Sequence, residues 1–187
     1  MNALEKYTLD RDSAVLLIID VQENLCKAMD SEVLRQLTGN LSTLLEAAKE
    51  LQIPVLVTEQ YPRGLGETVP AIREKLSVSA LEKMSFSCCG AVAFMNQLKE
   101  QRRKQVIVTG MESHVCVLQT VLELLADGYH VHVVNDAVMS RKKRNWKLGL
   151  NIAASAGAVV TSTETALFQL LKVAGTEEFK KLSKLVR

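Results

Sequence analysis

Short apolar runs recur along the chain, and the segments between them carry apolar residues at every third or fourth position. Runs that are apolar at nearly every position suit strands covered on both faces, which is typical of a parallel sheet. Four such runs and a weaker fifth span residues 14–19, 53–57, 106–108, 131–134 and 158–160. Because His130 and His132 break the apolar character of the fourth run, we expect that strand to be partly exposed.

The segments between the runs predict helices. Leucine and alanine recur in helical steps over residues 33–51, and Ser31 is placed to be the N-cap of that helix. Residues 114–126 are apolar nearly all round and are followed by Gly128 in the position of a C-terminal cap, which predicts a buried helix. Further helices are expected over residues 91–101, 141–155, 164–173 and 177–185.

The alternation of strand and helix predicts a protein of the α/β class, with an open parallel sheet and helices on both of its faces. A length of 187 residues suits one domain over residues 1–187. Residues 60–79 form the longest stretch without clear period and contain two prolines. Long loops in compact domains are usually functional, so we expect this one to form a pocket wall or lid.

Composition and charge exclude several classes of protein. Apolar residues make up 48% and charged residues 24%, which is ordinary globular usage and excludes fibrous and disordered chains. The net charge of +2 is too small to predict nucleic acid or an anionic membrane surface as the main partner. Five basic residues do fall within residues 141–147, but we interpret them as a solvated helix face. The N-terminus lacks an apolar signal core, so we expect a cytoplasmic protein with no membrane partner.

The four cysteines, Cys26, Cys88, Cys89 and Cys116, have no zinc-site spacing, and no histidines cluster with them. In a reducing compartment each is expected to be a thiol, acting as a small buried hydrophobe or as a reactive group. We assign no task to the first three, for which buried filler or pocket lining is the favoured interpretation.

Ligands of open α/β sheets bind beyond the carboxyl ends of the strands. The first predicted strand ends at Asp20, and the strand over residues 106–108 leads into Cys116, in the first turn of the predicted buried helix. The positive end of a helix can lower a cysteine pKa to between roughly 3.5 and 7.5, which would make Cys116 a nucleophile. From position alone, Cys116 as core filler and Asp20 as a helix cap remain equally good interpretations. His114 is too close to Cys116 along the chain to face it as a base.

Five segments in order carry a resemblance that covers nearly the whole chain. They are LLIIDVQ (16–22), VTEQYPRGLG (57–66), VTGMESHVCV (108–117), VVNDAVMSR (133–141) and VTSTETALFQLL (160–171). With these segments the sequence resembles the isochorismatase-like cysteine hydrolases, and within them the uncharacterised isochorismatase-domain hydrolases. The resemblance implies a Rossmann-like, three-layer α/β/α fold whose six-stranded parallel sheet has the order 3-2-1-4-5-6.

The resemblance also implies a catalytic triad of Asp20, Lys83 and Cys116. Asp20 would accept the thiol proton as Cys116 attacks an acyl carbon, and Lys83 would hold the carboxylate. A thioester on Cys116 would form, and water would hydrolyse it. The peptide bond between Met111 and Glu112 is expected to be cis, so that the amides of Glu112 and Cys116 form an oxyanion hole.

The expected reaction is cleavage of a small amide or related acyl substrate at a non-peptide C–N bond. Where nicotinamidases carry a metal-binding Asp and His, this sequence has Gln60 and Pro62, so we expect no metal and no cofactor. Relatives lead us to expect a homo-oligomer. The substrate pocket is expected to include Gln22, Tyr61, Phe86 and His114.

The alternative is a non-hydrolytic protein that senses redox state or binds ligands through a reactive Cys116. The triad favours the hydrolase, because a regulatory thiol does not need an ordered carboxylate and lysine beside it.

Overall fold

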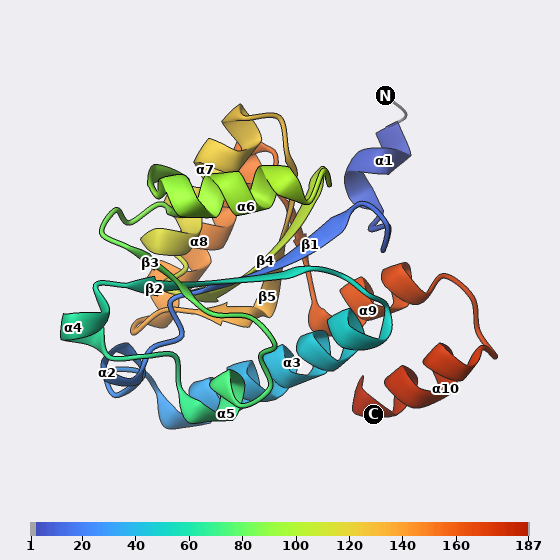
Figure 1. Cartoon of the computed structure of the whole chain (residues 1–187), viewed down its shortest axis with the longest axis horizontal. Helices are drawn as coiled ribbons and strands as arrows, with labels where there is room; N and C mark the ends of the chain where they lie inside the picture. Colours follow the sequence, from blue (N-terminus) through green and yellow to red (C-terminus); the bar gives the residue numbers. More distant parts are fainter. Residues whose placement is uncertain (1–2, 187) are drawn as a thin grey trace.

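The computed structural model describes residues 3–186, in which a six-stranded sheet lies between two layers of helices (Figure 1). The strands pair in parallel in the order β3-β2-β1-β4-β5-β6, so the predicted fold class and strand order are confirmed. The strands are β1 (Ala14–Ile19), β2 (Val55–Gln60), β3 (Leu81–Lys83), β4 (Gln105–Met111), β5 (His130–Met139) and β6 (Val159–Thr161).

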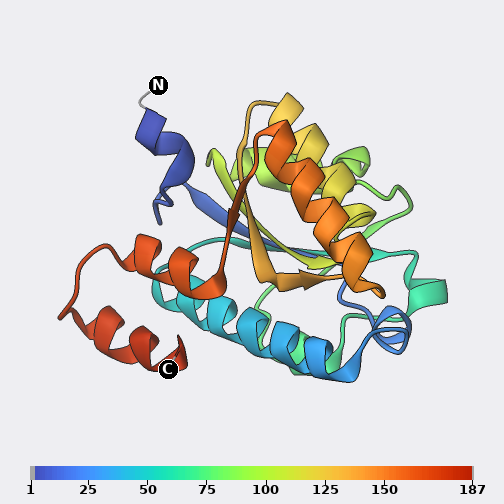
Figure 2. The same cartoon turned by 180° about the vertical axis from the view of Figure 1, so that it is seen from behind.

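The longer helices divide between the two faces of the sheet. Figures 1 and 2 show α3, α9 and α10 on one side and α6, α7 and α8 on the other. The helices are α1 (Ala3–Tyr7), α2 (Glu23–Cys26), α3 (Ser31–Glu50), α4 (Pro62–Leu65), α5 (Pro70–Arg73), α6 (Val92–Glu100), α7 (Cys116–Ala126), α8 (Lys143–Ala156), α9 (Thr163–Leu171) and α10 (Glu177–Leu182), with 3₁₀ turns at Cys88–Gly90 and Ser183–Val186.

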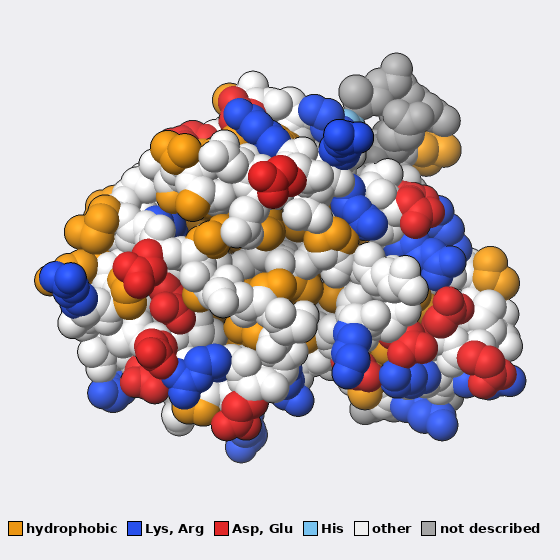
Figure 3. All heavy atoms as spheres, in the orientation of Figure 1, with side chains coloured by type: hydrophobic (Ala, Val, Ile, Leu, Met, Phe, Trp, Pro, Cys, Tyr) orange, Lys and Arg blue, Asp and Glu red, His pale blue; other side chains and the backbone are white. Residues whose placement is uncertain are grey.

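Strand β1 shows why continuous apolar runs become central strands. All six of its residues are buried, and they alternate between two core clusters, one on each face of the sheet. Because both faces are covered, neither set of alternate positions can be polar. Positive and negative side chains are mixed over the outer surface seen in Figure 3, in keeping with the small net charge.

Three expectations about element ends and exposure were wrong. Helix α3 is capped by Asp30, whose carboxylate accepts hydrogen bonds from the amides of Glu32 and Val33, and Ser31 is its first residue. The helix expected from residue 114 begins at Cys116, because Val115 has non-helical dihedral angles. His132 is fully buried, since β5 lies between β4 and β6 with both of its faces covered.

The region expected to be one long loop contains two short helices, α4 and α5, and is followed by β3. Strand β3 has only three residues and pairs with the end of β2 at the sheet edge. Such a short strand, two of whose three residues are charged, carries no apolar run in the sequence.

Gly110 allows β4 to approach the end of β1. Its φ is +106°, and a Cβ atom at this position would lie 2.0 Å from the backbone oxygen of Ile19. No other residue fits so close to a neighbouring backbone. The contact brings the residues that follow the two strands, Asp20 and the segment leading to Cys116, to the same point at the sheet edge.

Candidate active site

A buried ion pair joins the ends of β1 and β3. The Nζ atom of Lys83 lies 2.6 Å from Oδ2 of Asp20, and both side chains are completely inaccessible to solvent. The ammonium also donates to Oε1 of Gln60 at 2.8 Å and to the backbone oxygens of Ser85 and Phe86 at 3.2 and 2.9 Å. Burying two charges costs several kcal/mol per ion unless hydrogen bonds satisfy both of them, and this pair has those bonds.

Thr58 fixes the second oxygen of the Asp20 carboxylate. Its hydroxyl donates to Oδ1 of Asp20 at 2.8 Å, and its backbone oxygen accepts the Asp20 amide at 3.1 Å. Asp20 has a φ of +53°, an uncommon conformation for a residue that is not glycine. The carboxylate is therefore oriented by Lys83 from one side and Thr58 from the other.

Cys116 is the first residue of α7 and is 6% exposed. Its Sγ donates to Oε1 of Gln60 at 3.8 Å, and the Asp20 carboxylate is near enough to act on its pKa. Burial and the neighbouring Asp20 carboxylate raise the pKa of the Cys116 thiol, and the Lys83 charge opposes them only in part. The expectation that the helix start would lower this pKa was wrong, because desolvation and a nearby negative charge outweigh the helix end. The resting side chain is therefore a thiol, with the Asp20 carboxylate among its neighbours.

Two backbone amides at the ends of the segment from residue 112 to residue 116 have no acceptor in the described part of the chain. The Met111–Glu112 peptide bond is cis, as the resemblance implied. Within residues 3–186, the amides of Glu112 and Cys116 donate no hydrogen bond. The Glu112 carboxylate faces the other way, where it accepts the Arg141 amide at 2.8 Å and pairs with the Arg141 guanidinium at 3.1 Å.

The four residues expected in the substrate pocket lie in two different settings. Tyr61 and Phe86 are 48% and 54% exposed and follow the ends of β2 and β3. Gln22 is fully buried, and its amide group bonds the backbone of Gln60 and Gly66. His114 is half-buried, and both of its ring nitrogens contact the side chains of Ser140 and Asn145. Gln22 and His114 thus support the segments around the site.

Sequence reasoning missed the contribution of β2, whose last residues are polar and buried. Oε1 of Gln60 lies between the Lys83 ammonium and the Cys116 sulfur, and its Nε2 donates to the backbone oxygen of Met84 at 2.9 Å. The signal in the sequence is the run of polar residues at the carboxyl end of an apolar strand, which includes Gln60. Thr58 is also a polar residue near the carboxyl end of β2.

Cys88 lies beside the triad, with its sulfur 3.6 Å from the Thr58 hydroxyl. It is completely buried, and burial raises its pKa to about 12. Among the residues that the structure describes, no group of three or more His, Cys, Asp or Glu side chains is arranged to hold a metal ion. The expected lack of a metal and cofactor stays a prediction.

Comparison with known proteins identifies the class to which this fold and site belong. The isochorismatase domain matches residues 14–165. The chain is 41% identical over 180 residues to the secreted isochorismatase effector Isc1 of Phytophthora sojae, covering 94% of this chain and 85% of that protein. The MAR1 ribonuclease structure from Caenorhabditis elegans has a TM-score of 0.88 and 35% identity, covering 96% of this chain and 92% of its own.

A second structure, an octameric hydrolase of unknown specificity from Escherichia coli, has a TM-score of 0.87 and 20% identity, covering 95% of this chain and 90% of its own. That likeness shows the fold alone. The chain belongs to the isochorismatase family, as the sequence resemblance indicated. Membership supports a hydrolase-type function.

No helix within residues 3–186 is long and apolar enough to cross a membrane. The cytoplasmic location stays a prediction, and the name of the Phytophthora relative describes a secreted protein.

Proposed function

We propose that the protein is a cysteine hydrolase that cleaves a small amide or related acyl compound at a C–N bond through a thioester on Cys116. The observation that carries this proposal is the solvent-free Asp20–Lys83 pair beside the Cys116 thiol. A buried ion pair is costly and adds little to stability when compared with apolar packing, so its presence beside a thiol points to chemistry.

In the first half-reaction, Asp20 accepts the thiol proton as the Cys116 sulfur attacks the acyl carbon. The electron pair of the carbonyl moves to its oxygen, which accepts hydrogen bonds from the free amides of Glu112 and Cys116. When the tetrahedral intermediate collapses, the C–N bond breaks and Asp20 returns the proton to the leaving nitrogen. An acyl-thioester and a free amine result.

In the second half-reaction, Asp20 accepts a proton from water as the water oxygen attacks the thioester carbon. The C–S bond breaks, the carboxylic acid leaves, and the proton passes from Asp20 to the Cys116 sulfur. Lys83 keeps its proton throughout and holds Oδ2 of Asp20 at 2.6 Å. Thr58 holds the other oxygen, so the carboxylate cannot rotate away from the sulfur.

The competing proposal, a redox-sensing or ligand-binding protein, is less well supported. Oxidation of cysteine proceeds through the thiolate, and burial here raises the pKa of Cys116. A thiol of this kind reacts efficiently only with a base beside it at the moment of attack, which is the arrangement with Asp20.

Mass spectrometry tests the mechanism directly. The protein is incubated with a panel of small amides and ureas, and the intact mass and Cys116 peptide are examined for an acyl adduct. We expect Cys116→Ala to form no adduct and to abolish hydrolysis, whereas Cys89→Ala, a change at a partly buried cysteine outside the triad, keeps both. Full turnover by Cys116→Ala would overturn the covalent mechanism. Cleavage of RNA that survives this substitution would instead favour an activity like the one named for the Caenorhabditis structure.

We also propose that the protein forms a homo-oligomer, as its octameric Escherichia coli neighbour does. Light scattering coupled to size-exclusion chromatography tests this proposal, and a mass of one chain, 20.7 kDa, would refute it.

A further inference from the structure

Glu112 carries a buried carboxylate next to one of the two amides of the proposed oxyanion hole. The Glu112 side chain is 6% exposed, whereas Arg141, its ion-pair partner, is 57% exposed. Only the short side chain of Glu112 separates this carboxylate from the backbone amide of the same residue. The negative charge of the carboxylate therefore lies near the place where the proposed reaction builds negative charge on an oxygen atom.

Two groups of Arg141 hold this carboxylate. The Arg141 backbone amide donates to Oε2 of Glu112 at 2.8 Å. The Nε atom of the guanidinium donates to Oε1 and Oε2 of Glu112 at 3.1 and 3.2 Å. The backbone bond does not depend on the side chain at residue 141, whereas the positive charge comes from that side chain alone. Substitution of Arg141 therefore removes the cation and keeps the backbone bond.

Other backbone bonds fix the position of Glu112. Its backbone oxygen accepts the amide of Val115 at 2.9 Å. The amide of the next residue, Ser113, donates to the backbone oxygen of Met139 at 2.9 Å. Because these bonds do not involve the guanidinium, loss of the Arg141 side chain should leave the segment in place and should change mainly the local charge.

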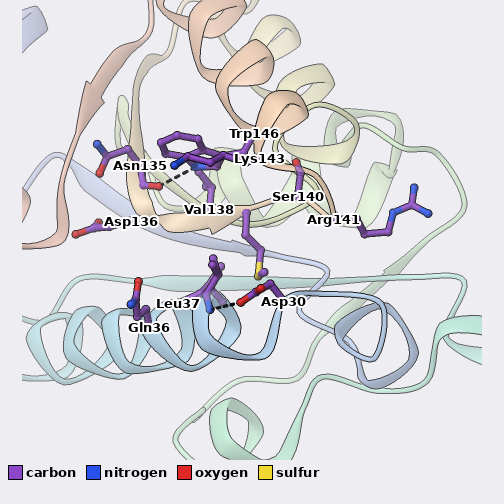
Figure 4. Close-up of a pocket in the computed structure, with 12 residues that line it drawn as sticks. Asp30, Gln36, Leu37, Asn135, Asp136, Val138, Ser140, Arg141, Lys143 and Trp146 are labelled. Carbon is purple, nitrogen blue, oxygen red and sulfur yellow. Dashed lines mark hydrogen bonds between the residues drawn. The ribbon is translucent and has the colours of Figure 1, made fainter.

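Arg141 differs from the other four basic residues of the segment 141–147. Within residues 3–186, none of those four forms an ion pair, whereas Arg141 pairs with Glu112. Figure 4 shows the Arg141 side chain pointing away from Lys143 and Trp146, with which it lines a pocket between α3 and α8. The charge of Arg141 is therefore committed to Glu112.

We infer that Arg141 keeps the oxyanion hole effective by neutralising the Glu112 carboxylate. Without the guanidinium, an unbalanced negative charge opposes the charge that develops on the substrate oxygen, and the barrier to attack rises. Arg141 touches no reacting atom, so it is a positioning residue that acts through Glu112. The inference rests on the proposed function, because acyl transfer is the reaction that builds an oxyanion at this place.

An activated acyl compound, p-nitrophenyl acetate, probes this step without an identified substrate. The Cys116 sulfur forms a bond to the acetyl carbon, the C–O bond breaks with release of p-nitrophenolate, and the thiol proton passes through Asp20 to water. Absorbance measures the released p-nitrophenolate, and mass spectrometry measures the acetyl adduct on Cys116.

Iodoacetamide is the reference reagent. It alkylates the same sulfur by displacement at a saturated carbon, so its reaction builds no oxyanion. Burial and the charges of Asp20 and Lys83 dominate the pKa of the Cys116 thiol. Loss of the Arg141 cation should therefore leave the thiol itself about equally reactive, and the ratio of acetylation to alkylation reports on the oxyanion hole.

Arg141→Met and Arg144→Met form a matched pair, because both replace an exposed arginine of the segment 141–147 and change the net charge equally. We expect Arg141→Met to slow acetylation about tenfold or more, because one unbalanced charge then lies near the reacting centre, and to change alkylation less than about twofold. Arg144→Met should leave both rates unchanged. Arg141→Lys, which keeps the positive charge, should retain most of the acetylation rate.

Glu112→Gln removes the negative charge and keeps an oxygen that can accept the Arg141 amide. In this background Arg141→Met should slow acetylation less than about twofold, because no carboxylate remains to be neutralised. Equal slowing in both backgrounds, equal effects of Arg141→Met and Arg144→Met, or a parallel fall in acetylation and alkylation would overturn the inference. A wild-type protein with no acetyl adduct on Cys116 would instead overturn the proposed nucleophile, and the inference with it.

Discussion

His132 should make the stability of the protein depend on pH in a defined window. The side chain is fully buried, and neither ring nitrogen has a hydrogen-bond partner among the described residues. Burial, aided by the charge of nearby His130, lowers the pKa of His132 from 6.5 to about 4. The folded state therefore holds this ring neutral under conditions in which the unfolded chain protonates it.

The sign and size follow from linkage. Because the pKa is lower in the folded state, the unfolded state binds more protons between about pH 6.5 and pH 4, and stability falls as the pH falls through this window. The free energy of unfolding should fall, relative to pH 7.5, by about 1 kcal/mol at pH 5.5 and by roughly 2–3 kcal/mol at pH 4.5. The full loss, below pH 4, is about 3 kcal/mol.

Urea unfolding followed by circular dichroism measures this dependence. The variant His132→Leu fills the same buried space without a titratable group. Between pH 7.5 and pH 4.5, its free energy of unfolding should therefore fall less than that of the wild type, by the amounts given above. His130→Gln, on the same strand and only half-buried, removes just the smaller, electrostatic cause of the shift, so its stability should decline with falling pH nearly as that of the wild type does. A difference in stability between wild type and His132→Leu that stays constant from pH 7.5 to 4.5 would refute the reasoning.

Three further results are expected. Lys83→Met should lower the free energy of unfolding by about 3–5 kcal/mol, because it leaves a buried carboxylate without its cation. Adding Asp20→Asn should recover part of that loss in a double-mutant cycle measured by urea unfolding, and strictly additive losses would contradict a coupled pair. Thr58→Val should lower kcat/KM on an identified substrate by about tenfold or more, because it removes the hydrogen bond to one oxygen of Asp20, and the fold should change little. Unchanged kinetics would show that Lys83 alone orients the carboxylate. Gly110→Ala should lower the melting temperature strongly, because a Cβ atom there would clash with the backbone of Ile19. Gly39→Ala, in α3 with open space around it, should instead raise the free energy of unfolding by about 0.5–1 kcal/mol. Equal effects of the two substitutions in calorimetry would contradict the close approach of Gly110 to Ile19.

The sequence predicted the sheet because its central strands are apolar on both faces, and β1 is the clearest case. It predicted neither β3 nor the true cap of α3. Strand β3 is a strand only through its pairing with β2, and Asp30 and Ser31 are both good caps next to each other, so local pattern does not choose between them. The burial of His132 also depends on which elements cover β5, which no local pattern contains.

The residues of the candidate site were likewise only partly predictable from the sequence. Asp20 and Cys116 follow from strand-end positions, since parallel strands deliver their carboxyl ends to one edge of the sheet. Lys83 is one of 23 basic residues and was reached only through the family resemblance. The pKa of Cys116 was misjudged because desolvation depends on packing from all sides, whereas the sequence showed only the start of the helix.

Residues 84–86, at the rim of the site, contact Lys83 and Gln60 through backbone oxygens and not through side chains. Lys83 donates to the backbone oxygens of Ser85 and Phe86, and Gln60 donates to that of Met84. The Met84 and Phe86 side chains remain largely exposed and make none of these bonds. The side chains at 84 and 86 can therefore change in size and polarity while the buried ion pair beneath them stays in place, so the surface around the pair can vary without disturbing it.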